Sequence, residues 1–183
     1  MLASIRREVT VRADARRNRE LIVTTAIGLF TEAGPGVSME EIARAADLGV
    51  GTLYRHFPDR QALLEAIALE ALDRLRTLIR AAVAQDVPRW QALGRVVEHC
   101  VEQPLALIKS LSPATPADPR RGDLEREVND LIEQLLEQAR EEGTLRPDIP
   151  PREVLGLLNV AICRPGARAD DHLITVILDG LRR

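Results

Sequence analysis

The side chains with the clearest chemistry lie close together between Gly51 and Arg60. Thr52 combines a hydroxyl, which can bond to phosphate oxygens or base edges, with a methyl group that can contact thymine. Arg55 has a guanidinium that can read guanine, although an arginine here also fits a solvated helix face. Gly51 has no side chain, so its backbone can approach a groove floor. These residue types favour contacts with nucleic acid.

Catalytic and metal-binding patterns find no support. The sequence contains no Gly-x-Ser-x-Gly, P-loop, HExxH or GxGxxG motif. His99 and Cys100 are neighbours, but neighbours on a helix point about 100° apart, which argues against a nucleophile–base pair. Cys100 and Cys163 fit no metal-ligand spacing, and reduced thiols in apolar helices behave as small hydrophobic groups. We therefore expect no enzyme, no cofactor and no metal site.

Two short helices are predicted to position the polar run. The first begins at Ser38, which with Glu41 forms a capping-box pattern. Gly49 is expected to take the positive φ of a tight turn. The second helix covers Val50 to His56 and ends before a proline. Residues 38–57 thus predict a helix-turn-helix, whose second helix lies in the major groove of DNA.

The flanking sequence strengthens this interpretation. LIVTTAIGLFTEAG precedes SMEEIARAADLGVGTLYRHFPDRQALLEAI, in which Asp59 is placed to cap the next helix. These segments resemble the DNA-binding domain of the TetR family of transcriptional regulators over roughly residues 15 to 75, most specifically in GTLYRHF and the capped helix after it. The resemblance implies an N-terminal three-helix domain, 15–75, and a C-terminal ligand-binding and dimerisation domain, 76–183.

The resemblance also implies roles for single residues. Tyr54 matches the family's tyrosine and is expected to place its phenol on a phosphate, and His56 is expected to reach the DNA backbone. Arg60 opens the next helix, where its charge and the helix N-terminus would act together on phosphate. Ser38 is a further candidate, although capping alone explains it. The predicted DNA-binding residues are Ser38, Val50, Gly51, Thr52, Tyr54, Arg55, His56 and Arg60.

The rest of the chain predicts helices separated by breaks. No alternating strand pattern persists, so we expect an all-α fold of about nine helices. The first helix is expected near Ala13, after an irregular arm over residues 1–12 whose arginines would enter a minor groove or stay solvated. A short helix is expected from Pro104 and a loop over residues 112–122.

Charge and apolar patterning indicate the partners. The net charge is −3, with arginines concentrated in the first 20 residues and acidic residues over 120–153, which suits contact with phosphate at one pole. The longest apolar run, Val154–Cys163, is too short to span a bilayer, so we expect no membrane partner and a cytoplasmic protein. Val154–Cys163 is apolar almost all round and Leu173–Leu181 forms another wide apolar surface, which favours burial of both against a twin chain. The resemblance implies the same homodimer, and a two-fold protein matches an inverted-repeat operator.

A small-molecule effector is implied mainly by the resemblance. Few aromatic and many aliphatic side chains favour an apolar ligand over a flat cation. The expected function is a repressor that such an effector releases from its operator. The alternatives are a DNA-binding regulator without an effector and an all-α scaffold for protein contacts. The candidate ligand-binding residues, each of which could equally be ordinary core, are Trp90, Leu93, Val97, Cys100, Leu107, Leu131, Leu135 and Leu158.

Overall fold

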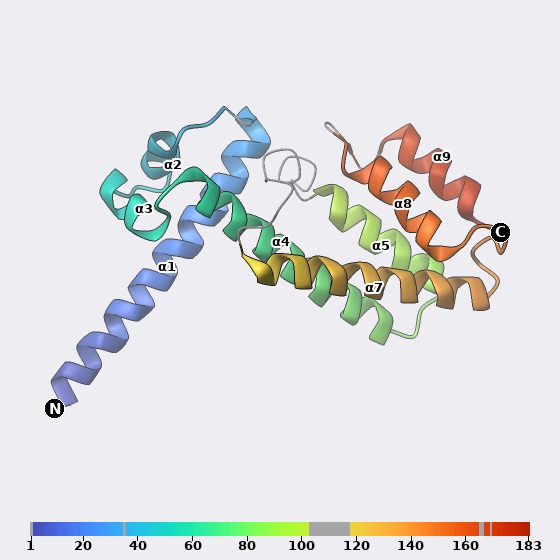
Figure 1. Ribbon diagram of the computed structural model, residues 1–183, viewed down its shortest axis with the longest axis horizontal. Coiled ribbons are helices and arrows are strands. Elements are labelled where there is room, and N and C mark those ends of the chain that lie inside the picture. Colours follow the sequence, from blue (N-terminus) through green and yellow to red (C-terminus); the bar gives the residue numbers. More distant parts are fainter. Residues whose placement is uncertain (1, 35, 103–117, 165–166, 169) are drawn as a thin grey trace. The chain divides into compact units, whose positions relative to one another are not determined.

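The computed structural model describes residues 2–34, 36–102, 118–164, 167–168 and 170–183. Within these ranges the chain is all-α, which confirms the predicted fold class (Figure 1). The short helix expected from Pro104 lies outside the described residues. The helices are α1 (Leu2–Ala33), α2 (Met39–Ala45), α3 (Val50–His56), α4 (Arg60–Ala84), α5 (Arg89–Glu102), α7 (Pro119–Glu141), α8 (Pro151–Ile162) and α9 (His172–Leu181).

The chain forms two compact units, Met1–Ile67 and Ala68–Arg183. The division falls within α4, which therefore supplies residues to both units. Our expected boundary between residues 75 and 76 lies later in the same helix, and it remains a prediction.

Two expected boundaries of helices are wrong. The first helix begins at Leu2 and not near Ala13. Extending an existing helix by further residues costs little, and no apolar periodicity in the sequence marks this extension. The loop expected over residues 112–122 does not extend to residue 122, because α7 begins at Pro119. Proline at the first helical position lacks only an amide proton that would be unpaired anyway, and Asp118 caps this end by accepting from the Arg120 amide at 2.9 Å.

The first unit packs α1, α2, α3 and the first turns of α4 around one apolar centre. α1 packs against α2, and both helices contribute a small buried side chain, Ala26 and Ala43. α2 in turn packs against α3. The side chains that are essentially inaccessible to solvent here are Ile22, Ala26, Ile42, Ala43, Leu53, Phe57, Leu63 and Ile67.

The second unit is a helical bundle with an aliphatic core. The helix α7 packs on α5 and α8, and α8 also packs on α9. The C-terminal residues are tied to the α7–α8 loop, where the Arg183 amide donates to the Thr144 carbonyl at 3.1 Å and the Arg146 amide donates to the Leu181 carbonyl at 3.0 Å. The core includes Leu75, Ile79, Leu93, Val96, Val97, Cys100, Val128, Leu135, Leu136, Ala139, Leu145, Val154, Leu158, Ala161, Ile174 and Leu181.

Candidate nucleic-acid interface

The helix α2 starts with the capping box that the sequence predicts. The Glu41 amide donates to Ser38 Oγ at 3.2 Å, and the Glu41 carboxylate accepts from the Ser38 amide at 2.7 Å and from the Ser38 hydroxyl at 2.8 Å. Hydrogen bonds from the Ser38 backbone and side chain lower the pKa of Glu41. The Ser38 hydroxyl is thus used within the protein, and the capping role accounts for the residue.

The turn between α2 and α3 differs from the expected one. Asp47, with φ of 54°, takes the left-handed conformation, whereas Gly49 has φ of −63°. Aspartate tolerates this region because its short side chain can bond locally, so the glycine is not needed for it. Gly49 instead caps α3 with its carbonyl, which accepts from the Thr52 amide at 2.8 Å and from the Leu53 amide at 3.2 Å.

The orientation of α3 is fixed by two apolar side chains. Leu53 and Phe57 are 0% and 1% exposed and hold the helix on the core of the first unit. The opposite side is open to solvent, with Val50 and Tyr54 about 40% exposed. Gly51 and Arg55 are also exposed, and Thr52 and His56 are half-buried at the flanks. The predicted residues of α3 therefore share one accessible surface.

Gly51 has no packing role within the protein. A Cβ atom added at this position would meet no atom within 4 Å, and the residue lies outside the left-handed region. Glycine within a helix costs roughly 1 kcal/mol relative to alanine. Neither packing nor backbone conformation requires a glycine at this position. A glycine here is consistent with close approach by a partner outside the chain.

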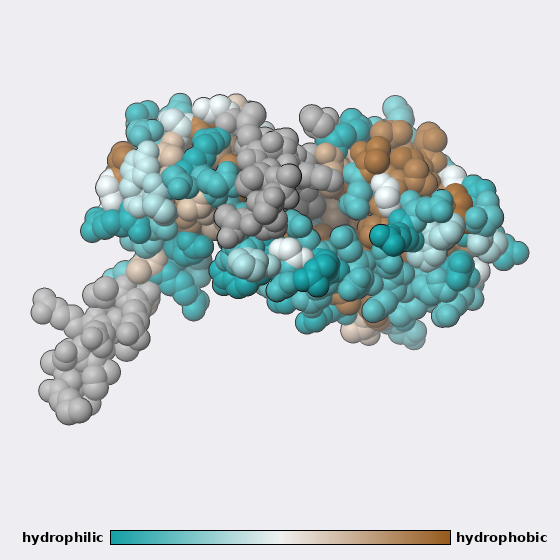
Figure 2. Space-filling view, viewed as in Figure 1, coloured by the Kyte–Doolittle hydropathy of each residue, from teal (hydrophilic) through white to brown (hydrophobic). Residues whose placement is uncertain are grey.

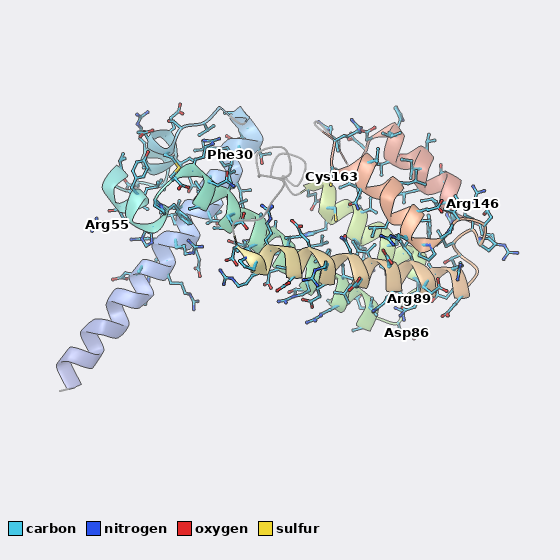
Figure 3. All side chains as sticks on the ribbon, viewed as in Figure 1. Phe30, Arg55, Asp86, Arg89, Arg146 and Cys163 are labelled. Atoms are coloured by element: carbon cyan, nitrogen blue, oxygen red, sulfur yellow. The ribbon has the colours of Figure 1, made fainter. Side chains whose placement is uncertain are left out.

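Arg55 lies along the exposed side of α3 (Figure 3). Its Nε donates to the Gly51 carbonyl at 3.1 Å, and its Nη2 donates to Thr52 Oγ1 at 3.0 Å. The structure thus brings Gly51, Thr52 and Arg55 together in one polar cluster. This arrangement holds the guanidinium on the surface of α3 while leaving it accessible.

Tyr54 reaches a residue that sequence reasoning missed. Its hydroxyl donates to Glu40 Oε1, on the first turn of α2, at 3.3 Å. Partial burial, followed by the charge of Glu40 and this hydrogen bond, raises the pKa of Tyr54. The phenol is therefore protonated at neutral pH and serves as a hydrogen-bond donor. No local pattern in the sequence marks a contact between residues 14 positions apart.

Arg60, predicted from the sequence to contact phosphate, makes contacts within the first unit. Its guanidinium lies 4.9 Å from the centre of the Phe30 ring, and its Nη1 donates to the Val37 carbonyl. A second arginine stacks in the same way, since the Arg19 guanidinium lies 4.5 Å from the centre of the Phe57 ring. Cation–π contacts of this kind contribute about 0.5 to 1 kcal/mol at exposed sites. Both arginines therefore help to hold the helices of this unit together.

The candidate effector residues gather in the second unit. Leu93, Val97, Cys100, Leu135 and Leu158 belong to its buried core, and Trp90 and Leu131 are partly buried against it. Leu107 lies outside the described residues. Burial raises the pKa of the Cys100 thiol to about 12, with a smaller contribution from Cys163, so Cys100 is a neutral thiol at physiological pH.

An exposed apolar surface covers α8 and α9. Val160 and Val176 are 71% and 66% exposed, and Leu157 and Leu173 are 43% and 42% exposed. Figure 2 shows hydrophobic residues gathered over these two helices. Leu158 does not belong to this surface, because it is 4% exposed and lies in the core of its own unit. We call Leu157, Val160, Leu173 and Val176 the α8–α9 surface.

Within the described parts of the chain, no three His, Cys, Asp or Glu side chains are grouped to hold a metal ion. Across those same parts, no helix is both long and apolar enough to cross a membrane.

Comparisons with known proteins agree with this geometry. Residues 22–67 match the family described as bacterial regulatory proteins, tetR family, and residues 89–183 match the transcriptional regulator SbtR-like C-terminal domain. The chain is 29% identical over 143 residues to the HTH-type transcriptional repressor LfrR of Mycolicibacterium smegmatis, covering 78% of this chain and 74% of that protein.

Two solved structures are similar over nearly the whole chain. A TetR transcription regulatory protein from Mycobacterium vanbaalenii is 32% identical with a TM-score of 0.66, over 94% of this chain and 99% of that one. The TetR transcriptional regulator SCO0520 from Streptomyces coelicolor is 30% identical with a TM-score of 0.61, over 90% of this chain and 98% of that one.

Proposed function

We propose a repressor function for this chain, which belongs to the TetR family of bacterial regulatory proteins. As a member of that family it is a DNA-binding transcriptional regulator and not an enzyme. The observation that carries the proposal is the orientation of α3, in which buried Leu53 and Phe57 leave Gly51, Tyr54 and Arg55 open to a partner. The similarity to LfrR, which is named a repressor, favours repression over activation.

In the proposed complex, α3 enters the major groove. The Gly51–Thr52–Arg55 cluster faces base edges, where a guanidinium can bond to guanine and the Thr52 methyl can contact thymine. Val50 adds apolar contact at the start of the helix. Phosphate contacts position a protein on DNA without reading its sequence. We assign this positioning role to Tyr54 and His56, and also to Ser38 and Arg60, in addition to the contacts that these two residues make within the chain.

We propose that the α8–α9 surface forms a homodimer with the same surface of a second chain. Four large apolar side chains exposed on two adjacent helices form a patch of the kind that marks interaction sites. A two-fold dimer presents two α3 helices and is matched by an inverted-repeat operator. Such a regulator would act in the cytoplasm, where it meets the chromosome.

A small apolar effector is proposed to bind among the aliphatic side chains of the second unit. The residues assigned to it are Trp90, Leu93, Val97, Cys100, Leu107, Leu131, Leu135 and Leu158. A compound that binds the DNA-free conformation more tightly must weaken DNA binding by the same factor. α4 supplies residues to both units and is the element proposed to couple them.

The test begins with selection of bound duplexes from a random DNA pool. The expected result is an inverted repeat, bound with an affinity that falls steeply as salt concentration rises. Light scattering of the selected complex should give two chains per operator. Failure to enrich any sequence from the pool, with the protein folded, would exclude sequence-specific binding and support the scaffold alternative.

The effector is tested on the same complex. Apolar compounds are screened for release of the selected operator, and those that release it are titrated against Trp90 fluorescence. The expected result is a change in emission over the concentration range that releases DNA. A Trp90→Phe variant, which has no tryptophan, provides the control for emission by the compound itself. Release without any change in Trp90 emission would place the effector elsewhere.

A further inference from the structure

Two neighbouring glutamates begin α2, and only one of them is explained by the helix. Glu41 closes the capping box with Ser38. Glu40 is exposed and takes no part in that cap, although an acidic residue in the first turn is favourable to the helix dipole. The dipole does not account for the contact that Glu40 makes, a hydrogen bond of 3.3 Å from the Tyr54 hydroxyl on α3.

We propose that Glu40 is a positioning residue that competes with DNA phosphate for the Tyr54 hydroxyl and so lowers the affinity for all DNA sequences. In the DNA-free protein the carboxylate accepts a hydrogen bond from this hydroxyl. In the complex the hydroxyl donates to a phosphate oxygen instead. The inference rests on the proposed function, because it requires Tyr54 to contact the DNA backbone.

The competition follows from the chemistry of the three groups. A phenol has one proton, so its hydroxyl donates to one acceptor at a time unless the bond is shared. Carboxylate and phosphate are both anionic acceptors, and the exchange therefore replaces one charge-assisted hydrogen bond by another. The net gain from the Tyr54–phosphate bond is small as long as the Glu40 bond must be broken first.

Charge repulsion adds to this competition. Tyr54 is 40% exposed and Glu40 is exposed, so a phosphate that reaches the hydroxyl comes close to the carboxylate. Like charges a few ångströms apart repel even in water. Because phosphates carry no sequence information, the resulting loss of affinity is nearly equal for an operator and for unrelated DNA.

The experiment compares the wild-type dimer with Glu40→Gln, which keeps an oxygen acceptor near Tyr54 and removes the charge. Fluorescence anisotropy measures binding to a random-sequence duplex and to the selected operator over a series of salt concentrations. We expect Glu40→Gln to bind both duplexes roughly threefold to tenfold more tightly, the effect of one charge pair near a surface. The gain should shrink as salt rises. Glu32→Gln, an exposed residue of α1, makes the same change of net charge and should have little effect.

A second comparison separates competition from repulsion. In a Tyr54→Phe background there is no hydroxyl to release, so we expect a smaller gain from Glu40→Gln. An equal gain in both backgrounds would overturn the competition for the hydroxyl. Equal or weaker binding of Glu40→Gln than of wild type would overturn the inference, and so would a changed preference at one base pair, which would mean that Glu40 reads a base. Wild-type protein that binds neither duplex would overturn the proposed function itself.

Discussion

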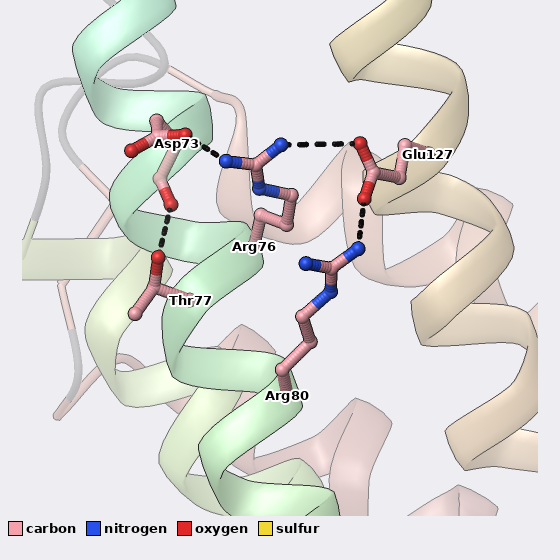
Figure 4. Close-up of polar contacts among 5 residues, drawn as sticks. All are labelled: Asp73, Arg76, Thr77, Arg80 and Glu127. Carbon is pink, nitrogen blue, oxygen red and sulfur yellow. Dashed lines mark hydrogen bonds and ion pairs between the residues drawn. The ribbon is translucent and has the colours of Figure 1, made fainter.

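Arg80 on α4 and Glu127 on α7 form an ion pair 2.5 Å long within the second unit. The same carboxylate accepts from Arg76 Nη1 at 3.3 Å, and Arg76 also pairs with Asp73 on its own helix (Figure 4). Glu127 therefore binds two successive turns of α4. Since the proposed coupling runs through α4, this carboxylate is placed to limit how far α4 moves against α7.

Glu127→Ala is expected to lower the free energy of unfolding by about 1 kcal/mol. Exposed ion pairs contribute about 0.2 to 1 kcal/mol each, and all three side chains here are partly exposed, so a contribution of about 0.5 kcal/mol from each of the two pairs is expected. Urea unfolding monitored by circular dichroism measures this loss, which should decrease at high salt. Glu133→Ala on the same helix is the control. Equal losses in both variants would show that the change reflects α7 itself and not the link to α4.

Gly51→Ala is expected to stabilise the protein and to weaken DNA binding. Space is open around the position, so the added methyl group costs nothing within the chain, and alanine is better than glycine in a helix by roughly 1 kcal/mol. Against DNA, the same methyl group would separate α3 from the groove. Gly28→Ala is a matched control, because it is also an exposed helical glycine with no atom within 4 Å of an added Cβ. It should stabilise without affecting DNA binding. Unchanged operator affinity of Gly51→Ala would exclude close approach at this position.

Local signals in the sequence predicted most of the first unit. The capping box of Ser38 and Glu41 lies within one turn, and the burial of Leu53 and Phe57 follows from helical spacing. What could not be predicted depends on contacts distant in sequence. The stacking of Arg60 on Phe30 and the bond from Tyr54 to Glu40 arise only when separate helices meet. A charged side chain in the sequence does not reveal whether it faces DNA or its own protein.

In the second unit, the sequence predicts where helices lie better than which of their side chains are buried. Apolar stripes predicted its helices, but Leu158 and Val160 both occur in one apolar run, and only the packing of α8 decides which is exposed. A proline is compatible with a break between helices or with the first residue of a helix, and Pro119 and Pro151 each begin a helix. Distinguishing a helix start from a loop requires the cap beside it, as Asp118 provides for α7.

Val160→Glu and Val176→Glu are each expected to dissociate the proposed dimer. Both valines are exposed in the single chain, so the charge costs little in the monomer and much in an apolar interface. Light scattering over a dilution series measures the association, and circular dichroism verifies the fold. Leu21→Glu, which changes a 42% exposed leucine of α1, is the control. Leu158→Glu is unsuitable, because it would place a charge in the core of its own unit. Dimers that persist in both valine variants would place the interface elsewhere.

The buried thiol of Cys100 contributes a loss of stability at alkaline pH that one substitution should reduce. Burial raises its pKa from 9.0 to about 12, so the folded chain keeps the thiol proton over a range in which the unfolded chain loses it. The contribution of this thiol to the free energy of unfolding is therefore fully present below the thiol's pKa in the unfolded chain. It is lost as pH rises from about 9 towards about 12. Cys100→Ala removes the titrating group at the cost of a small cavity, so it should be less stable at neutral pH and lose less stability on alkaline titration. Urea unfolding at neutral and alkaline pH measures both differences. Cys163→Ala, at a position that is only half-buried, is the control and should retain the wild-type loss. Parallel curves for wild type and Cys100→Ala would show that other groups carry the alkaline instability.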